Sequence, residues 1–251
     1  MTQSSYEQLV NEALAQDFSG WDFSWLHGRW HEGAPSWNYR ELVQLQLLHA
    51  DSLLDMGTGG GEFLASLSGL PAMVYATESY SPNIRIAQAR LEPLGIEVLP
   101  LEHDQELPLP DRSVQLVINR HESYWVPELF RILEPGGIFL TQQVGALDCV
   151  QINEFLAAAP DANIGVWTLK NETEQLEQAG FQIQRAEEAF LDSIFDDIGA
   201  VVFFLKIIEW QIPDFSIEKY YDRLLMMHQQ IIDQGPFRAK AHRFLIKAQK
   251  R

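Results

Sequence analysis

The chain has 251 residues, of which 46% are hydrophobic and 21% charged, so it can bury a core and is not globally disordered. Its 35 acidic and 18 basic residues give a formal net charge of −17, which disfavours nucleic acid as a partner. Six of the basic residues lie between Pro236 and Arg251, and the preceding 235 residues carry −23. We interpret this basic stretch as an edge strand protected by lysines, with an RNA contact as the alternative.

Cys149 is the only cysteine, which excludes a disulfide framework and a thiolate metal cage. His27 and His31 have helical spacing without a supporting acidic pattern, so no metal site is expected. The first 30 residues lack a basic segment followed by an apolar one, and no apolar run reaches about 20 residues. We therefore expect a cytoplasmic protein without a signal peptide or a membrane partner. The sequence does not indicate an oligomeric state.

The middle of the chain alternates short apolar runs with amphipathic stretches. Strands are predicted at 52–56, 73–77, 96–101, 114–119 and 138–144, and helices at 62–68, 81–91 and 126–133. Ser81 is expected to cap its helix, with proline at the first helical position. This alternation predicts an α/β fold with a parallel sheet, whose ligands bind beyond the carboxyl ends of the strands.

The flanking segments have a different character. Residues 1–37 contain four of the seven tryptophans, Trp21, Trp25, Trp30 and Trp37, and are expected to form an N-terminal helical cap. A cofactor-binding core is predicted over 38–189, a helical cap insertion over 190–238, and a last strand with the basic tail over 239–251. The insertion would hold helices at about 192–210 and 216–234. No linker marks an independent domain, so we expect a single domain.

The strongest chemical signal is the segment Leu54-Asp55-Met56-Gly57-Thr58-Gly59-Gly60-Gly61-Glu62. A strand that ends in a carboxylate and enters a glycine-rich turn is typical of a nucleotide site, because glycines let a ligand approach the backbone closely. Glu78 lies 19 residues after Gly59, at the end of the next strand, where a carboxylate can accept hydrogen bonds from ribose hydroxyls. A P-loop is excluded because no Gly-Lys-Ser/Thr follows. The dinucleotide fingerprint fails because Glu62 and Leu64 stand where its third glycine is needed.

This motif resembles the first motif of the class I S-adenosylmethionine-dependent methyltransferases, of the methyltransferase type 11 kind. Three further landmarks follow in the family's order: Glu78 at the ribose position, residues 107–117 before the fourth strand, and residues 131–137 before the fifth. The likeness spans about residues 40–145. It implies a doubly wound, mostly parallel, seven-stranded Rossmann-like sheet, with its last strands at 181–185 and 242–247. Both caps would then cover the carboxyl ends of the strands.

The resemblance also implies S-adenosylmethionine as the cofactor. The residues expected to bind it are Asp55, Gly57, Thr58, Gly59, Gly61, Glu78, Asp104, Gln105 and Asn119. Of these, Asp104 and Gln105 fall in the loop after the third strand, which holds the adenine in this family. The chain departs from the family's nucleobase-amine members after the fourth strand, where Asn119-Arg120-His121-Glu122-Ser123-Tyr124 replaces their paired prolines. His121 or Glu122 is the candidate general base, needed only for a protonated acceptor.

We therefore expect methyl transfer to a small-molecule acceptor whose identity the sequence does not reveal. Two alternatives stay open. One is an aminopropyl-type transferase on the same fold, although no paired aspartates mark a polyamine channel. The other is a non-catalytic module that keeps the cofactor pocket and recognises a partner through its aromatic N-terminal segment.

Overall fold

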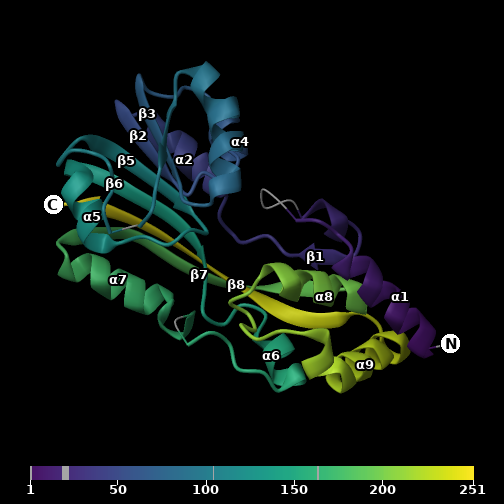
Figure 1. The fold of residues 1–251 in the computed structure, drawn as a ribbon. Helices are drawn as coiled ribbons and strands as arrows, with labels where there is room; N and C mark the ends of the chain where they lie inside the picture. The colour runs from purple at the N-terminus through teal and green to yellow at the C-terminus, as the bar shows by residue number, and fades with distance from the viewer. Residues whose placement is uncertain (1, 19–22, 104, 163) are drawn as a thin grey trace. The chain divides into compact units, whose positions relative to one another are not determined.

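A computed structural model describes residues 2–18, 23–103, 105–162 and 164–251 (Figure 1). Its α-helices are α1 (Thr2–Leu14), α2 (Tyr39–Leu47), α3 (Glu62–Ala65), α4 (Ser81–Leu91), α5 (Val126–Ile132), α6 (Val150–Leu156), α7 (Leu169–Gln178), α8 (Ile198–Ile207) and α9 (Ile217–Gln234). Its strands are β1 (Trp30–Glu32), β2 (Ser52–Met56), β3 (Met73–Glu78), β4 (Glu97–Pro100), β5 (Val114–Arg120), β6 (Leu133–Val144), β7 (Phe181–Phe195) and β8 (Phe237–Lys250). Short 3-10 turns lie at Ser24–Leu26, Glu92–Leu94 and Ile164–Val166.

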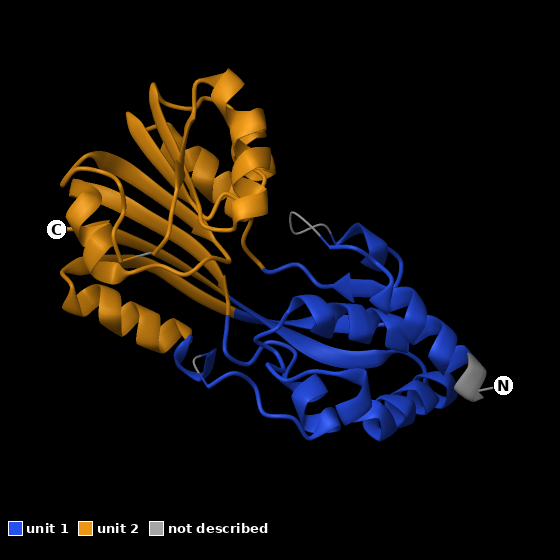
Figure 2. Cartoon of the chain, in the orientation of Figure 1, with its two compact units in different colours: residues 1–35, 145–167, 189–243 blue, residues 36–144, 168–188, 244–251 orange. Residues whose placement is uncertain are grey.

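The chain divides into two compact units, coloured separately in Figure 2. Unit 1 contains residues 1–35, 145–167 and 189–243, and unit 2 contains residues 36–144, 168–188 and 244–251. The long strands β7 and β8 therefore contribute residues to both units. The expected core lies largely in unit 2, and most residues of the two expected caps lie in unit 1. The predictions of a single domain and of caps over the strand ends stay predictions.

Unit 2 is built on a sheet with the strand order β7-β8-β6-β5-β2-β3-β4. The pairs β2–β3, β2–β5, β3–β4 and β5–β6 are all parallel. Helix α4 packs against β3 and β4, α2 against β5, and α5 against β6. All five residues of β2 are buried, as expected for a strand covered on both faces. The predicted α/β fold with a mostly parallel sheet is confirmed.

The sheet has eight strands rather than the predicted seven. The additional strand β1 lies in unit 1, where Trp30 pairs with Phe195 and Glu32 with Ser193 in an antiparallel ladder with β7. With three residues, β1 is too short to show the alternation that identifies a strand in a sequence. It lies inside the segment that was predicted to be helical.

The observed bounds of several elements differ from the predicted ones. β7 has 15 residues instead of the predicted five, so α8 begins at Ile198, where the Asp197 side chain accepts a hydrogen bond from Ala200 N at 3.0 Å. The predicted cap Ser81 is instead the first residue of α4, after the N-cap Tyr80. The segment 134–137, which lies between the predicted helix 126–133 and the predicted strand 138–144, is part of β6, and the register of β6 with β5 shifts between Val114 and Leu116.

Unit 1 has a helical core around α8, which packs against α1 and α9. Nine of the ten residues of α8 are buried, because this helix is apolar on every side. Tyr6 and Val10 of α1 are buried in the same cluster. Residues near the N-terminus therefore complete the core of unit 1.

Three tryptophans of the first 37 residues have described positions. Trp25 packs on Phe203, with ring centroids 4.8 Å apart, and Trp30 stacks on Phe195 at 6.1 Å. Trp37 belongs to unit 2, where it is buried and its Nε1 donates to Gln142 Oε1 at 2.8 Å. Trp21 lies outside the described residues. Trp25 and Trp30 thus act as packing residues within unit 1.

Candidate functional site

The strand register of unit 2 brings the predicted site residues to one edge of the sheet. Met56, the last residue of β2, pairs with Thr77 on one side and Asn119 on the other. Asn119 in turn pairs with Thr141 of β6. The glycine-rich loop, Glu78 and the segment after Asn119 therefore leave the sheet side by side, because the carboxyl ends of parallel strands share an edge.

The glycine-rich loop adopts the backbone conformation that its sequence predicts. Gly57, Gly59 and Gly61 have φ angles of +68°, +61° and +80°, in the left-handed region that favours glycine. Thr58 N donates to Thr77 O at 2.9 Å, and Gly61 N to Thr58 O at 3.0 Å, so the loop is tied to β3 and closed on itself. A Cβ atom on Gly61 would lie 2.7 Å from Leu91 Cγ, so glycine also permits the close packing of α4.

Asp55 is the last residue but one of β2 and is only 5% exposed. Its Oδ2 accepts a hydrogen bond from Thr58 Oγ1 at 2.8 Å. Burial raises the pKa of Asp55 to about 7, although the Thr58 hydrogen bond and the charge of Arg120 act in the opposite direction. The charge of Glu78 raises the pKa further. Asp55 is thus a carboxylate whose ionisation a nearby cation would favour.

Glu78 is 4% exposed and turns back onto its own loop. Its Oε1 accepts from Tyr80 N at 2.8 Å, and the backbone N–H groups of Gly59 and Ser79 also bond to the carboxylate. Burial nevertheless raises the pKa of Glu78, with these hydrogen bonds opposing it. The contact with Gly59 links Glu78 directly to the glycine-rich loop. The sequence interpretation that placed both in one site is supported by this geometry.

A small pocket lies at this edge of the sheet. It is lined by Met56, Gly57, Thr77, Glu78, Ser79, Leu101 and Glu122. Glu78 and Glu122 therefore face the same space. A larger, more open hollow near Glu106–Pro110 is lined by Arg131, whose guanidinium donates to the carbonyls of Leu107 and Leu109. We place the candidate site in the small pocket, because Gly57 of the glycine-rich loop and Glu78 both line it.

Asn119 is fully buried at the end of β5. Its Oδ1 accepts from Thr141 Oγ1 at 2.9 Å and from Gln143 Nε2, and Tyr39 OH donates to its backbone carbonyl at 2.9 Å. Among the described residues, Asn119 Nδ2 has no hydrogen-bond partner. A buried N–H group without a partner is unusual and is compatible with a donor kept for a ligand.

The two candidate bases occupy different places. Glu122 is half-buried and lines the pocket, whereas His121 is exposed and is absent from its lining. The His121 ring Nε2 lies 3.3 Å from Gln142 Nε2. The adjacent pair in the sequence is therefore divided in space, and only Glu122 reaches the glycine-rich loop.

Two further residues complete the comparison with the predicted site. Gln105 is exposed and does not line the pocket, and Asp104 lies outside the described residues. Sequence reasoning missed Gln143, whose Nε2 donates to Asn119 Oδ1, to Thr141 Oγ1 at 2.7 Å and to Glu122 O at 3.0 Å. The sequence pattern could have identified Gln143, because Thr141 and Gln143 are polar residues two apart on a buried strand and so share a face.

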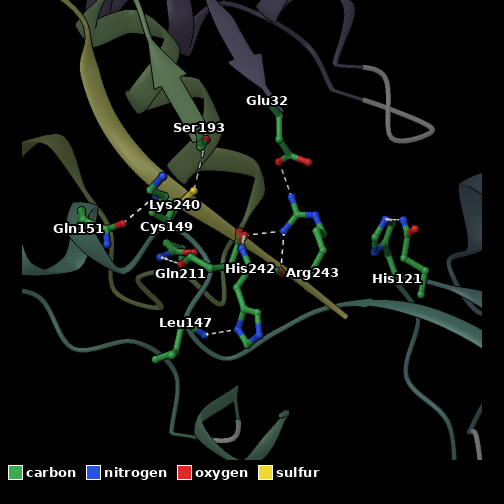
Figure 3. A network of polar contacts seen from close by, with 12 residues as sticks. Glu32, His121, Leu147, Cys149, Gln151, Ser193, Gln211, Lys240, His242 and Arg243 are labelled. Carbon is green, nitrogen blue, oxygen red and sulfur yellow. Dashed lines mark hydrogen bonds and ion pairs between the residues drawn. The ribbon is translucent and has the colours of Figure 1, made fainter. Parts of the chain in front are cut away.

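Unit 1 contains a second buried polar network, which no motif predicted (Figure 3). Arg243 donates to Glu32 Oε2 and to Asp148 Oδ1, and the same Asp148 oxygen accepts from His242 N at 2.8 Å. Burial raises the pKa of Glu32, and the charge of Arg243 lowers it. The network joins β1, β8 and the loop after β6, and each of its two carboxylates has a cationic partner.

Within the described ranges, no three His, Cys, Asp or Glu side chains are arranged to hold a metal ion. None of the described helices combines the length and the apolar character needed to cross a membrane.

Comparisons with known proteins agree with this geometry. Residues 54–141 match the methyltransferase domain family, from β2 to β6. A malonyl-[acyl-carrier protein] O-methyltransferase of Marinomonas sp. (strain MWYL1) is 32% identical over 119 residues, which are 43% of this chain and 44% of that protein. The chain thus matches less than half the length of this curated relative.

Solved structures share the fold at low sequence identity. The YcgJ protein of Bacillus subtilis has a TM-score of 0.61 at 16% identity, over 85% of this chain and 98% of its own. A candidate methyltransferase of Bacillus halodurans C-125 has a TM-score of 0.59 at 18% identity, over 82% and 98%. The [4+2]-cyclase SpnF has a TM-score of 0.53 at 16% identity, over 84% and 79%. Residues 54–141 are therefore similar to the methyltransferase domain family, and the solved structures share the fold of the chain.

Proposed function

We propose that the chain is an S-adenosylmethionine-dependent enzyme that transfers a methyl group to a small-molecule acceptor. The observation that carries this proposal is the glycine-rich loop, which leaves β2 between Asp55 and Glu78 with three glycines at positive φ. A pyrophosphate at this loop would meet buried carboxylates, whereas a cationic cofactor would be attracted to them. The residues present therefore fit S-adenosylmethionine better than a dinucleotide.

Each cofactor-binding residue has a distinct role in this proposal. Glu78 would accept hydrogen bonds from the ribose hydroxyls, as carboxylates at the end of this strand do in nucleotide-binding folds. Gly57 and Gly59 would let the cofactor lie on the backbone. Asp55 would supply negative charge beneath the loop, and Asn119 Nδ2, which lacks a partner among the described residues, could donate to the cofactor. The roles of Asp104 and Gln105 at the adenine stay predictions.

The bound cofactor would supply a methyl group on a sulfonium, which is already activated for transfer. The protein then has to align the acceptor and exclude water more than it has to move protons. A general base is required only if the acceptor is a protonated oxygen or nitrogen. His121 and Glu122 are the candidates for that base: Glu122 lines the pocket, whereas His121 is exposed and outside its lining.

The identity of the methyl acceptor has to be inferred separately from the reaction type. The Marinomonas relative is named for O-methylation of a malonyl group on acyl-carrier protein, so a malonyl thioester is a reasonable first acceptor to test. The fold does not decide the reaction, since the [4+2]-cyclase SpnF shares it. A small molecule remains our proposal because the net charge of −17 disfavours nucleic acid.

The direct test is cofactor binding by calorimetry, followed by a turnover assay. We expect S-adenosylmethionine and S-adenosylhomocysteine to bind, and NAD and ATP to bind much more weakly. Methyl transfer would be followed as a mass gain of one methyl group in a metabolite extract, with a malonyl thioester as a separate arm. Tighter binding of NAD than of S-adenosylmethionine would overturn the assignment.

The same assays separate the alternatives. An aminopropyl-type transferase would consume decarboxylated S-adenosylmethionine and release methylthioadenosine. A non-catalytic module would bind the cofactor without forming S-adenosylhomocysteine, whichever acceptor is offered. We expect neither result, because the sequence has no paired aspartates that would mark a polyamine channel, and the glycine-rich loop, Asp55 and Glu78 are all present at one edge of the sheet.

A further inference from the structure

The side chain of Glu122 lies directly against the glycine-rich loop. A Cβ atom added to Gly57 would lie 2.3 Å from Glu122 Cγ, 2.5 Å from its Cβ and 3.0 Å from its Oε2. Glu122 also lines the small pocket that Glu78 lines. Glycine at position 57 therefore leaves room for a carboxylate on top of the loop, in addition to allowing the positive φ.

Two consecutive residues of β6, Gln142 and Gln143, form hydrogen bonds with the backbone of His121 and Glu122. His121 N donates to Gln142 O at 2.9 Å, and Gln143 Nε2 donates to Glu122 O at 3.0 Å. His121 has a φ of +64°, an uncommon conformation for a residue other than glycine. Such a conformation persists when the surrounding contacts determine it. The turn that directs Glu122 to Gly57 is thus built into the sheet edge.

The order of the strands indicates which part of the cofactor Glu122 would meet. The central strand β2 lies between β5 and β3, and β4 lies beyond β3. If Glu78 at the end of β3 holds the ribose and the loop after β4 holds the adenine, the other end of the cofactor would extend across β2 toward β5. Glu122 follows β5. The part of S-adenosylmethionine that extends in this direction is the methionyl end, which carries an ammonium and a sulfonium.

We propose that Glu122 is a cofactor-binding residue, whose carboxylate pairs with a cationic group of the methionyl end, rather than a general base acting on the acceptor. This inference rests on the proposed function. The shared pocket of Glu122 and Glu78 and the closeness of Glu122 to Gly57 carry it. It assigns Glu122 to the cofactor and leaves His121 as the candidate base.

Calorimetry with three ligands tests the proposal. Glu122→Gln keeps the shape of the side chain and removes its charge, and Glu92→Gln, at an exposed position of the same unit, is the matched control. The ligands are S-adenosylmethionine with both cations, S-adenosylhomocysteine with the ammonium alone, and methylthioadenosine with neither. Glu122→Gln should weaken S-adenosylmethionine binding about tenfold to a hundredfold, the range of a charge-assisted hydrogen bond. The affinity of the Glu122→Gln variant for methylthioadenosine should equal that of the unaltered protein.

The comparison of S-adenosylmethionine with S-adenosylhomocysteine shows which cation is recognised. A matching loss for S-adenosylhomocysteine assigns the ammonium, and an unchanged affinity assigns the sulfonium. Glu122→Asp, which retains the charge, should recover part of the binding. Equal weakening of all three ligands would mean that Glu122 is structural. Unchanged binding together with loss of the acidic limb in the pH profile of turnover would make Glu122 the general base. Either result overturns this inference alone, whereas an unaltered protein that binds neither S-adenosyl ligand overturns the proposed function with it.

Discussion

The two units each contain buried carboxylates, and the clusters differ in how their charge is balanced. In unit 1, Glu32 and Asp148 both form ion pairs with Arg243. In unit 2, Asp55 accepts a hydrogen bond from the hydroxyl of Thr58, and Glu78 accepts hydrogen bonds from backbone N–H groups. Neither Asp55 nor Glu78 forms an ion pair with another described residue.

This difference separates a structural cluster from a binding site. A buried carboxylate paired with arginine already has its counter-charge, so it holds segments together and needs no ligand. A buried carboxylate stabilised only by neutral donors keeps its negative charge at a cost in desolvation. A cationic ligand can offset that cost, which is why perturbed carboxylates in a pocket indicate function. Four experiments address this contrast, from the largest expected effect to the smallest.

The largest effect is expected from Arg243→Met in unit 1. The change leaves Glu32 and Asp148 buried without their cation, and breaking a buried ion pair in this way costs about 3–5 kcal/mol. Urea denaturation at pH 8 measures the loss in the free energy of unfolding. Lys240→Met on the same strand is the control, because its pair with Asp192 is exposed and should contribute little. Equal losses in the two variants would show that Arg243 is not a buried clamp.

Glu78→Ala should weaken binding of S-adenosylmethionine without unfolding the protein. Loss of a charge-assisted hydrogen bond costs about 1.5–3 kcal/mol, which corresponds to roughly a tenfold to hundredfold change in Kd. Calorimetry gives the affinity, and the thermal midpoint reports the fold. Glu97→Ala, at an exposed position of β4, should change neither. A collapsed midpoint with normal affinity would make Glu78 structural.

The ligand-free protein should lose stability as pH rises toward 7, because of Asp55. Burial raises its pKa to about 7, and an unfolded aspartate titrates near pH ~3.9. Between these values the folded state binds more protons than the unfolded state, so the free energy of unfolding falls by up to about 1.4 kcal/mol per pH unit. Arg120 and Glu78 are the charged groups that influence this titration.

Asp55→Asn should flatten this pH dependence and raise the stability of the ligand-free protein. Asparagine can still accept the hydrogen bond from Thr58, so the loop contact is retained. In the unaltered protein, affinity for S-adenosylmethionine should rise as Asp55 ionises, and binding should release protons. Thermal unfolding and calorimetry between pH 5 and 8 measure both effects. A variant with the same pH dependence as the unaltered protein would assign the titration to another group.

The smallest effect is expected at Glu62, the carboxylate that directly follows the glycine-rich loop. Its side chain is 62% exposed and pairs with Arg90, which also donates to Gly60 O. Exposed pairs contribute about 0–1 kcal/mol, so Glu62→Gln should change stability by no more than that. Cofactor affinity should stay within about twofold, as measured by calorimetry. A loss comparable to that of Glu78→Ala would show that exposed charge near the loop matters as much as buried charge.

The sequence predicts those residues of the candidate site that directly follow a strand in the chain. The glycine-rich loop, Asp55 and Glu78 follow their strands directly, and parallel strands bring their carboxyl ends to one edge whatever lies between them. The positive φ angles of Gly57, Gly59 and Gly61 were likewise implied by residue type. Periodicity was sufficient to find β2, β3, β5 and the helices between them, because burial on both faces leaves a continuous apolar run.

Other features were decided only by the tertiary structure. His121 and Glu122 are adjacent in the chain, and the positive φ at His121, held by β6, places only Glu122 against Gly57. The pair of Glu32 with Arg243 joins residues 211 positions apart, and β1 exists because β7 extends to Phe195. Spacing along a sequence reports the period of one element and the residues that end it. It carries no record of which distant side chain will supply a counter-charge, because that depends on which strands become neighbours when the chain folds.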